Sequence, residues 1–454
     1  MFIDNVERVI ISLRLNMSFR GKIWVLLISA VVAGYVMIGG MPPVGSLLQT
    51  QAQQPINDAG AQLRIFESVL QHIQNDYVDE PNLEKVRFGA LRGLVGGLDP
   101  YSSYLTVDQV KAFNNGGNSG KAGIGAEFSQ VSLYLYVVSV IKGSNADTAG
   151  LRAGDVIEYI EDKATRDISL YDARQMILGD PGTTVNLRVL RAGARPQVMK
   201  VVRGNYKIPP VESRTEAGKI GVVKVYTLDT GESEDIRKQV QNLAAQGVDK
   251  IVLDLRGVAT GTLDEGVSTA NLFIKSGEIA KVIGRDNKAI KSYTANPAKA
   301  VFDGKVAVLI DLGTAGAAEI VASAILDNKR GDVVGERSFG SGTEQNLFQL
   351  RGGDGLLLTT AKWASGAGVP FLGDDRESMG VKPSVEVKRP DTPEPLEVEE
   401  LIDQQDEELQ NPQPSASPTP APKTDVKEPL REDLQLKKAL EILREKAQAA
   451  KAGE

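Results

Sequence analysis

Between residues 219 and 388 the sequence alternates apolar runs with amphipathic segments, and this alternation restricts the fold more than any other feature. The runs KIGVVKVYTL, KIVLDLRGV, KVAVLIDLG and DVVGER are typical of buried strands, whereas SEDIRKQVQNLAAQG and EGVSTANLFIKSG have the spacing of helices. Such alternation predicts an α/β core, assigned to residues 205–390, with a mixed sheet and helices packed on it. A site in this core is expected where strand ends meet turns.

Residues 121–204 have a different pattern. Short β-rich runs (LYLYVVSVI, DVIEYIED and TVNLRVLR) are punctuated by glycine, and one helical stretch, LYDARQMIL, lies between the last two. This pattern predicts a small β-rich module. It contains GIGAEF at 123–128 and SNADTAGLRAGD at 144–155.

Helical segments are expected at both ends of these two units. Residues 61–120 form an N-terminal helical region, because apolar residues recur at helical spacing in QLRIFESVLQHI and again from Leu83 to Leu94. The motif LDPYSSYL follows. Residues 391–429 are acidic and then rich in proline, which is typical of a disordered linker, and residues 430–454 predict a C-terminal helix.

The N-terminus predicts a membrane segment. Residues 23–41 are uncharged and apolar over nearly the ~20 residues that a helix needs to cross a bilayer. Residues 1–22 carry Arg8, Arg14, Arg20 and Lys22, so the basic flank is expected to stay cytoplasmic and the body to lie outside the cytoplasm. A cleavable signal peptide is the alternative to this single-pass anchor.

Composition excludes several classes of function. The net charge of −7 is spread along the chain without a basic cluster, which argues against a nucleic-acid partner. Cysteine is absent, so thiol nucleophiles and Cys-ligated metals are excluded, and no metal or other cofactor is expected. The single histidine, His72, lies in an amphipathic helical stretch, where a structural role is expected and a Ser-His-Asp triad is not.

The β-rich module resembles a PDZ domain, since GIGA is followed by AGLRAGD at the expected distance. In that family the loop equivalent to Gly123, Ile124, Gly125 and Ala126 presents backbone N–H groups to the carboxylate of a peptide C-terminus, and the peptide adds as a strand. Glycines let successive N–H groups converge into an anion-binding nest. The resemblance implies peptide or protein C-termini as partners.

The chain as a whole resembles the carboxyl-terminal processing peptidases, PDZ-containing serine peptidases that use a Ser/Lys dyad. The resemblance covers residues 61–388 and the final DLQLKKALEIL, and it rests on LDPYSSYL, GIGA with AGLRAGD, DLRG, AAEIVASAILDNKR, VVGERSFGSG and LLLTTAKW, in that order. It implies the fold of that family and, where the dyad is present, peptide-bond hydrolysis.

The dyad positions implied by this resemblance hold other residues. The family turn resembles S-A-S-A-S-E-I, and alignment through Glu319 places Gly316 at the position of the serine nucleophile. The family loop F-G-K-G reads FGSG here, so Ser341 stands at the position of the lysine base, 25 residues later, as in the family. Gln345, at the position of a glutamine that orients the lysine, is retained. A serine hydroxyl attacks only when a base takes its proton, so this pattern predicts an inactive site.

The turn that helps to form the family's oxyanion hole also differs. The family pattern resembles D-L-R-x-N-P-G-G, whereas here DLR is followed by Gly257, Val258, Ala259, Thr260 and Gly261. One of the paired glycines is therefore replaced by Thr260. Because backbone N–H groups need the geometry of that turn to face an oxyanion, weaker oxyanion stabilisation is expected.

Three functions stay open at this point. The first is a membrane-anchored pseudopeptidase that binds peptide C-termini; the second is an active serine endopeptidase with a rearranged site; the third is a regulatory partner of an active family member. The rearranged site would draw its nucleophile from Thr314, Ser338 or Ser341 and its base from Lys329 or Lys362. Each has a plain structural role: Thr314 is expected in a turn, Lys329 in a charged turn and Lys362 after a strand.

Overall fold

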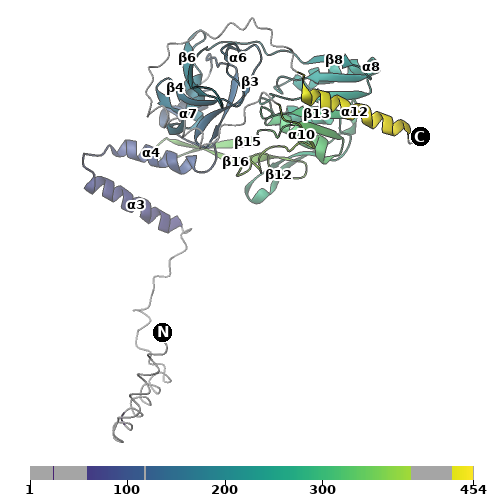
Figure 1. Ribbon diagram of the computed structural model, residues 1–454. Coiled ribbons are helices and arrows are strands. Elements are labelled where there is room, and N and C mark those ends of the chain that lie inside the picture. Colours follow the sequence, from purple (N-terminus) through teal and green to yellow (C-terminus); the bar gives the residue numbers. More distant parts are fainter. Residues whose placement is uncertain (1–23, 25–58, 117–118, 390–431, 453–454) are drawn as a thin grey trace, which may run out of the picture. The chain divides into compact units, whose positions relative to one another are not determined.

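The computed structural model describes Trp24 and residues 59–116, 119–389 and 432–452 (Figure 1). The chain divides into two compact units, Met1–Val86 and Arg87–Glu454. Apart from Trp24, the predicted membrane segment 23–41 lies outside the described residues, as does the predicted linker 391–429. Within the described ranges, no helix combines the length and the apolar character that crossing a membrane requires.

The first unit contains the predicted N-terminal helix. Helix α3 spans Ala59–Asp76 and has no buried residue. His72 lies on it with its Nδ1 atom 2.6 Å from Oδ2 of Asp76, and both side chains are mostly exposed. The histidine is therefore a surface helix residue, as predicted. Helix α4, Leu83–Gly96, crosses the boundary between the units.

The β-rich module is built on a six-stranded antiparallel sheet with the order β2-β3-β4-β6-β7, in which β5 also pairs with β4. Its strands are β2 (Ala126–Val131), β3 (Tyr134–Val140), β4 (Val156–Ile160), β5 (Lys163–Ala164), β6 (Thr184–Leu190) and β7 (Gln197–Val202). Helices α6 (Asn145–Thr148) and α7 (Leu170–Ile177) complete it. Apolar residues of one face of the sheet form a core, which includes Ile124, Leu135, Ile157 and Leu187. Strand β2 is an edge strand of this sheet.

The α/β core contains the predicted mixed sheet, with the order β17-β14-β13-β10-β9-β8. Strands β9, β10, β13, β14 and β17 pair in parallel, and β8 is antiparallel to β9. The strands are β8 (Glu212–Glu216), β9 (Ile220–Lys224), β10 (Lys250–Asp254), β13 (Lys305–Ile310), β14 (Gly331–Gly335) and β17 (Val385–Glu386). This topology fits the alternation that the sequence shows.

Helices cover both faces of this sheet. Helices α8 (Glu232–Ala245), α9 (Leu263–Asn271) and α10 (Ala317–Asp327) share a core with Leu253 and Val308. The C-terminal helix α12, Leu434–Ala452, packs on the other face through Ala439 and Leu443 and lies beside β13 (Figure 1). Alternate residues of each central strand thus face different layers.

A second, antiparallel sheet was not predicted. Its order is β1-β16-β11-β12, and β15 pairs with the other side of β16. The strands are β1 (Ser103–Leu105), β11 (Glu278–Ile283), β12 (Ala289–Thr294), β15 (Thr343–Gln349) and β16 (Gly355–Ser365). Lys362 lies within β16, not after a strand as expected, because the apolar run LLLTT continues as a half-buried strand through Lys362. The helix α5 (Val107–Asn114) follows β1.

Candidate functional site

The candidate site lies where β13 and β14 end. After β13 the carboxylate of Asp311 accepts hydrogen bonds from the N–H of Gly313 (3.0 Å) and the hydroxyl of Thr314 (3.2 Å), which closes a tight turn. Gly316 follows as the N-cap of α10, with φ 57° and ψ −112°. A side chain at this position would project from a sharp strand-to-helix turn, a geometry in which several hydrolases hold their nucleophile.

Gly316 and Ser341 face each other. A Cβ atom at Gly316 would lie 3.7 Å from the Oγ atom of Ser341 and 3.7 Å from Cζ3 of Trp363, and no other atom is closer. Ser341 comes from the loop between β14 and β15, and Trp363 comes from β16. The structure therefore brings together the two residues that the sequence singled out, across a space large enough for a side chain.

Glu319 joins the two turns. Its buried carboxylate accepts hydrogen bonds from the N–H of Gly316 (2.8 Å), the N–H of Ser341 (2.9 Å), the N–H of Gly340 (2.8 Å) and the hydroxyl of Ser338 (2.5 Å). Burial raises the pKa of Glu319 to about 7, against the opposing effect of these donors. One carboxylate thus fixes the start of α10 and the Ser338–Ser341 loop together.

Gly316 and Ser341 line a cleft of about 250 Å³. The β-rich module contributes Glu127, Phe128, Val138 and Arg174, and the core contributes Ala259, Gly261, Ala315, Gly316, Phe339, Ser341, Gly342, Thr343, Gln345 and Trp363, with Tyr101 from the LDPYSSYL motif. The ring of Tyr136 stacks on that of Phe339 at 5.7 Å between centroids, which joins the module to the core at this place. Gln345 also lines the cleft, and its amide donates to the hydroxyls of Thr343 (2.6 Å) and Thr359 (3.2 Å).

The turn from Gly257 to Gly261 also reaches the cleft. The N–H of Gly257 donates to Asp311 (2.9 Å), and Thr260 turns its hydroxyl toward that of Thr227 (2.8 Å), away from the cleft. Among the hydrogen bonds of the described residues, none has the N–H of Ala259 or Gly261 as its donor. The altered turn therefore still presents unengaged backbone donors beside Gly316.

The predicted peptide loop has its carbonyl groups engaged and its N–H groups free. The carbonyl oxygens of Gly123, Ile124 and Gly125 accept from the N–H groups of Gly204 (3.0 Å), Ala146 (2.9 Å) and Ile141 (2.9 Å). No hydrogen bond within the described ranges uses the N–H of Gly123, Ile124 or Gly125. Three successive donors without an acceptor are suited to an anion.

The edge of β2 leads from this loop to the cleft. Val137 lies opposite Phe128 but exchanges its backbone bonds with Gly154 and Asp155, so the backbone groups of Phe128 point to the free edge. The carbonyl of Phe128 accepts from Nη2 of Arg174 (2.9 Å), which also pairs with Glu127. Burial raises the pKa of Glu127, and the charge of Arg174 lowers it in part.

Comparisons with known proteins agree with this geometry. A model of peptidase family S41 matches residues 219–387, and a PDZ domain model matches residues 136–191. The chain is 34% identical over 334 residues to a "Probable CtpA-like serine protease" of Staphylococcus aureus (strain MRSA252), which covers 73% of this chain and 66% of that protein. A Staphylococcus epidermidis protein of the same name is 29% identical over 375 residues, covering 81% of this chain and 74% of that protein.

Among solved structures, the photosystem II D1 C-terminal processing protease superposes with a TM-score of 0.60 at 26% identity, covering 73% of this chain and 88% of that one. The chain belongs to the carboxyl-terminal processing protease family. The predicted α/β core with a PDZ domain is thereby confirmed. The chain spans 66% of the length of the S. aureus relative.

Of the alternative nucleophiles that the sequence suggested, Ser341 alone lines the cleft. Thr314 and Ser338 have no exposed surface. The hydroxyl of Thr314 donates to the carbonyl of Leu255 (3.0 Å), and that of Ser338 donates to Glu319. Both hydroxyls therefore hold the turns together. In the described part of the chain, no group of three or more His, Cys, Asp and Glu side chains could hold a metal ion.

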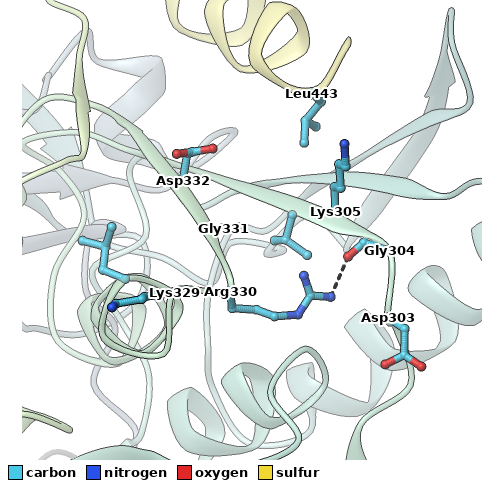
Figure 2. A pocket seen from close by; sticks show the side chains of 10 residues that line it. Asp303, Gly304, Lys305, Lys329, Arg330, Gly331, Asp332 and Leu443 are labelled. Carbon is cyan, nitrogen blue, oxygen red and sulfur yellow. Dashed lines mark hydrogen bonds between the residues drawn. The ribbon is translucent and has the colours of Figure 1, made fainter. Parts of the chain in front are cut away.

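The alternative bases lie elsewhere in the structure. Lys362 donates to the carbonyl of Leu372 (3.1 Å) and does not line the cleft. Lys329 lines a separate hollow of about 460 Å³ at the opposite end of the strands, where β13 and β14 begin (Figure 2). Neither amine is placed to take a proton from Ser341.

Sequence analysis missed Glu319, Arg174 and Trp363 as residues of the candidate site. Glu319 served only to align the turn, although a lone carboxylate within the apolar run AAEIVASAIL should be buried and must find donors there. Arg174 and Trp363 had no such local signal. They reach the cleft from α7 and β16 by long-range packing.

Proposed function

We propose that this processing-protease homologue binds extended peptide C-termini along β2 and in the adjoining cleft without cutting them. We also propose that residues 23–41 anchor the chain in a membrane with the body outside the cytoplasm, as the apolar run and its basic flank suggest. The relatives are named serine proteases, and hydrolysis is the property in which this chain is proposed to differ.

The observation that carries the proposal is the approach of Gly316 to Ser341. The family resemblance places a serine nucleophile and a lysine base at these positions, and here Gly316 and Ser341 face each other across a space that would admit a side chain. Gly316 has no atom with which to attack, and the hydroxyl of Ser341 does not accept a proton at neutral pH. The unengaged N–H groups of Ala259 and Gly261 would leave a binding site for a carbonyl oxygen without a reaction.

Binding is supported by the loop and the edge strand. The free N–H groups of Gly123–Gly125 suit a terminal carboxylate, and a peptide that pairs with the outward groups of Phe128 would run toward Gly316 along one continuous surface.

One observation favours the alternative of an active enzyme: Ser341 presents a hydroxyl to the cleft. The third candidate, a regulatory partner of an active family member, uses the same peptide-binding surface and differs only in needing a second protein.

The experiment compares three full-length proteins: the natural chain, the variant Ser341→Ala and the double variant Gly316→Ser, Ser341→Lys. Each is incubated with an unfolded protein that has an apolar C-terminus, and products are followed by mass spectrometry. We expect no cleavage by the natural chain and detectable cleavage by the double variant. Cleavage by the natural chain that disappears in Ser341→Ala would establish the rearranged site.

Binding is measured separately, with a labelled peptide and its C-terminally amidated form. The control is placed in the peptide because a Cβ atom at Gly125 would fall 2.2 Å from Cβ of Ser144, so any side chain there disrupts the loop itself. We expect the amide to bind about tenfold more weakly, because amidation removes the charge-assisted hydrogen bonds that the carboxylate would accept. Equal binding of both forms would show that the Gly123–Gly125 loop does not bind the terminal carboxylate.

Membrane attachment is tested by alkaline extraction of membranes from cells that express the full-length chain and a chain beginning at residue 59. Retention of the full-length chain alone is expected. Release of both would leave residues 23–41 without an anchoring role.

A further inference from the structure

Two residues near the C-terminal end of the described chain, Arg389 and Asp433, contact residues that directly precede the turns lining the cleft. Arg389 is the last described residue before position 390, and Asp433 immediately precedes α12. Arg389 pairs with Asp311 (3.1 Å), and Asp433 pairs with Arg256 (2.8 Å). Arg256 directly precedes the Gly257–Gly261 turn, and Asp311 directly precedes the turn to Gly316.

Arg256 is held from both sides by carboxylates. Its Nη2 atom donates to Asp254 (2.7 Å) and to Asp433 (2.8 Å), and its Nη1 atom donates to Asp433 (2.9 Å) and Gln435 (3.2 Å). The Arg256 side chain is 15% exposed, so these are well-shielded, charge-assisted contacts. Burial alone would raise the pKa of Asp433, but the contact with Arg256 holds it below its usual value.

Asp311 links Arg389 to both turns. One carboxylate oxygen accepts from the N–H groups of Gly257 (2.9 Å) and Gly313 (3.0 Å), and the other lies 3.1 Å from the guanidinium of Arg389. The turns are also joined directly, because the N–H of Ala315 donates to the carbonyl of Val258 (2.9 Å).

Helix α12 is the element that brings Asp433 to this place. Its apolar face, with Ala439 and Leu443, covers Val252, Ala307 and Leu309 of the central sheet. Gln435 is fully buried and donates to the carbonyl of Val387 (2.8 Å). This hydrogen bond fastens the start of α12 to the residue that follows β17.

We propose that Asp433 is a positioning residue for the cleft: through Arg256 it holds the Gly257–Gly261 turn against the Ala315–Gly316 turn, so that docking of α12 and binding in the cleft are coupled. Asp433 touches no residue that lines the cleft, and it acts only through Arg256 and the backbone that follows it. Coupling of this kind is reciprocal: a ligand that favours the ordered turn favours the docked helix by the same factor.

The first test needs no ligand. Amide hydrogen exchange is measured over peptides that contain Ala315 and residues 257–261, in Asp433→Asn and in Glu432→Gln. Both variants remove one negative charge, and asparagine retains the ability to cap the helix. Glu432 is the matched control, because its partner is the exposed Lys437 of the same helix.

We expect exchange at Ala315 to become roughly tenfold faster in Asp433→Asn and to stay unchanged in Glu432→Gln, since a charge-assisted contact supports the local structure. Asp433→Glu, which keeps the charge, should recover part of the protection. Equal rates in Asp433→Asn and Glu432→Gln would overturn the proposal, and so would faster exchange spread evenly over the whole core.

A second variant acts on the helix at a distance from the ion pair. Leu443 lies on α12 above Lys305 and Gly331, at the opposite end of the sheet from the cleft (Figure 2). Leu443→Ala weakens docking and leaves Asp433 in place. Coupling predicts faster exchange at Ala315 in this variant also, whereas unchanged exchange at Ala315 beside faster exchange in α12 would contradict it.

The reciprocal test, which measures the effect of a bound peptide on α12, rests on the proposed peptide binding. Saturation with the labelled peptide should slow exchange in residues 434–445 of the natural chain and much less in Asp433→Asn. Absence of peptide binding would count against the proposed function and leave the ligand-free result standing. Binding without any change in α12 would contradict the coupling alone.

Discussion

The Oγ atom of Ser341 lies 3.7 Å from the point at which Gly316 would carry a Cβ atom. The two residues come from different turns, and the buried carboxylate of Glu319 holds both of them through its hydrogen bonds to their N–H groups. The backbone of Gly316 has the conformation of a residue that presents a side chain to a cleft, and the neighbouring space would admit one. The scaffold at this position therefore has room for a side chain.

Introduction of a side chain at position 316 should cost strain without steric overlap. At φ 57° an L-residue is strained by about 1–3 kcal/mol, while the nearest atoms would be 3.7 Å away. We expect Gly316→Ser to lower the free energy of unfolding by this amount in urea titrations, with an unchanged m-value.

Gly93→Ala is the contrasting substitution. Gly93 lies inside α4, and no atom is within 4 Å of its Cβ position. The same added carbon should raise stability there by up to about 1 kcal/mol, because alanine favours the helix. A loss at Gly316 far above about 3 kcal/mol would show that the space beside Ser341 is closed in solution.

The pairing of Gly316 with Ser341 was implied by the family resemblance. The fold explains it, because both residues follow parallel strands, β13 and β14, whose carboxyl ends lie at the same edge of the sheet. It did not predict Trp363 in the cleft, since β16 pairs with β1, β11 and β15 over long sequence separations that no local pattern encodes. Thr260 in the Gly257–Gly261 turn was expected to weaken oxyanion stabilisation, and this stays a prediction. In the described residues the N–H groups of Ala259 and Gly261 are unengaged, and the hydroxyl of Thr260 contacts that of Thr227.

Glu319 should make stability depend on pH. Burial raises its pKa in the folded protein to about 7 from an ordinary value of 4.5, so the folded state binds the proton more tightly than the unfolded chain does. The stability that this group contributes is then complete below about pH 4.5 and is lost as the pH rises through about 7.

Glu319→Gln removes this titration, so the difference in unfolding free energy between the natural chain and the variant should shrink as the pH rises from 5 to 8. The test is a series of urea titrations across that range. A difference that stays constant across this range would mean that the four donors keep the carboxylate ionised and its pKa no higher than the ordinary value.

Arg174 should compete with a bound peptide. A strand that adds to β2 needs the carbonyl of Phe128 as an acceptor, and Nη2 of Arg174 already donates to that carbonyl at 2.9 Å. Removing this donor should therefore tighten binding, by roughly threefold to tenfold for one hydrogen bond. The suitable variant is Arg174→Met combined with Glu127→Gln, because Arg174→Met alone would leave the partly buried Glu127 without its charged partner.

Glu127→Gln alone is the matched control, since it keeps Arg174 and its bond to Phe128, and its affinity should equal that of the natural chain. Affinities are measured by fluorescence anisotropy with the labelled peptide and its amidated form. If the double variant binds the free carboxylate more weakly but the amide equally well, Arg174 recognises the peptide terminus. If both forms bind more tightly, Arg174 occupies the edge of β2 and a peptide must displace it.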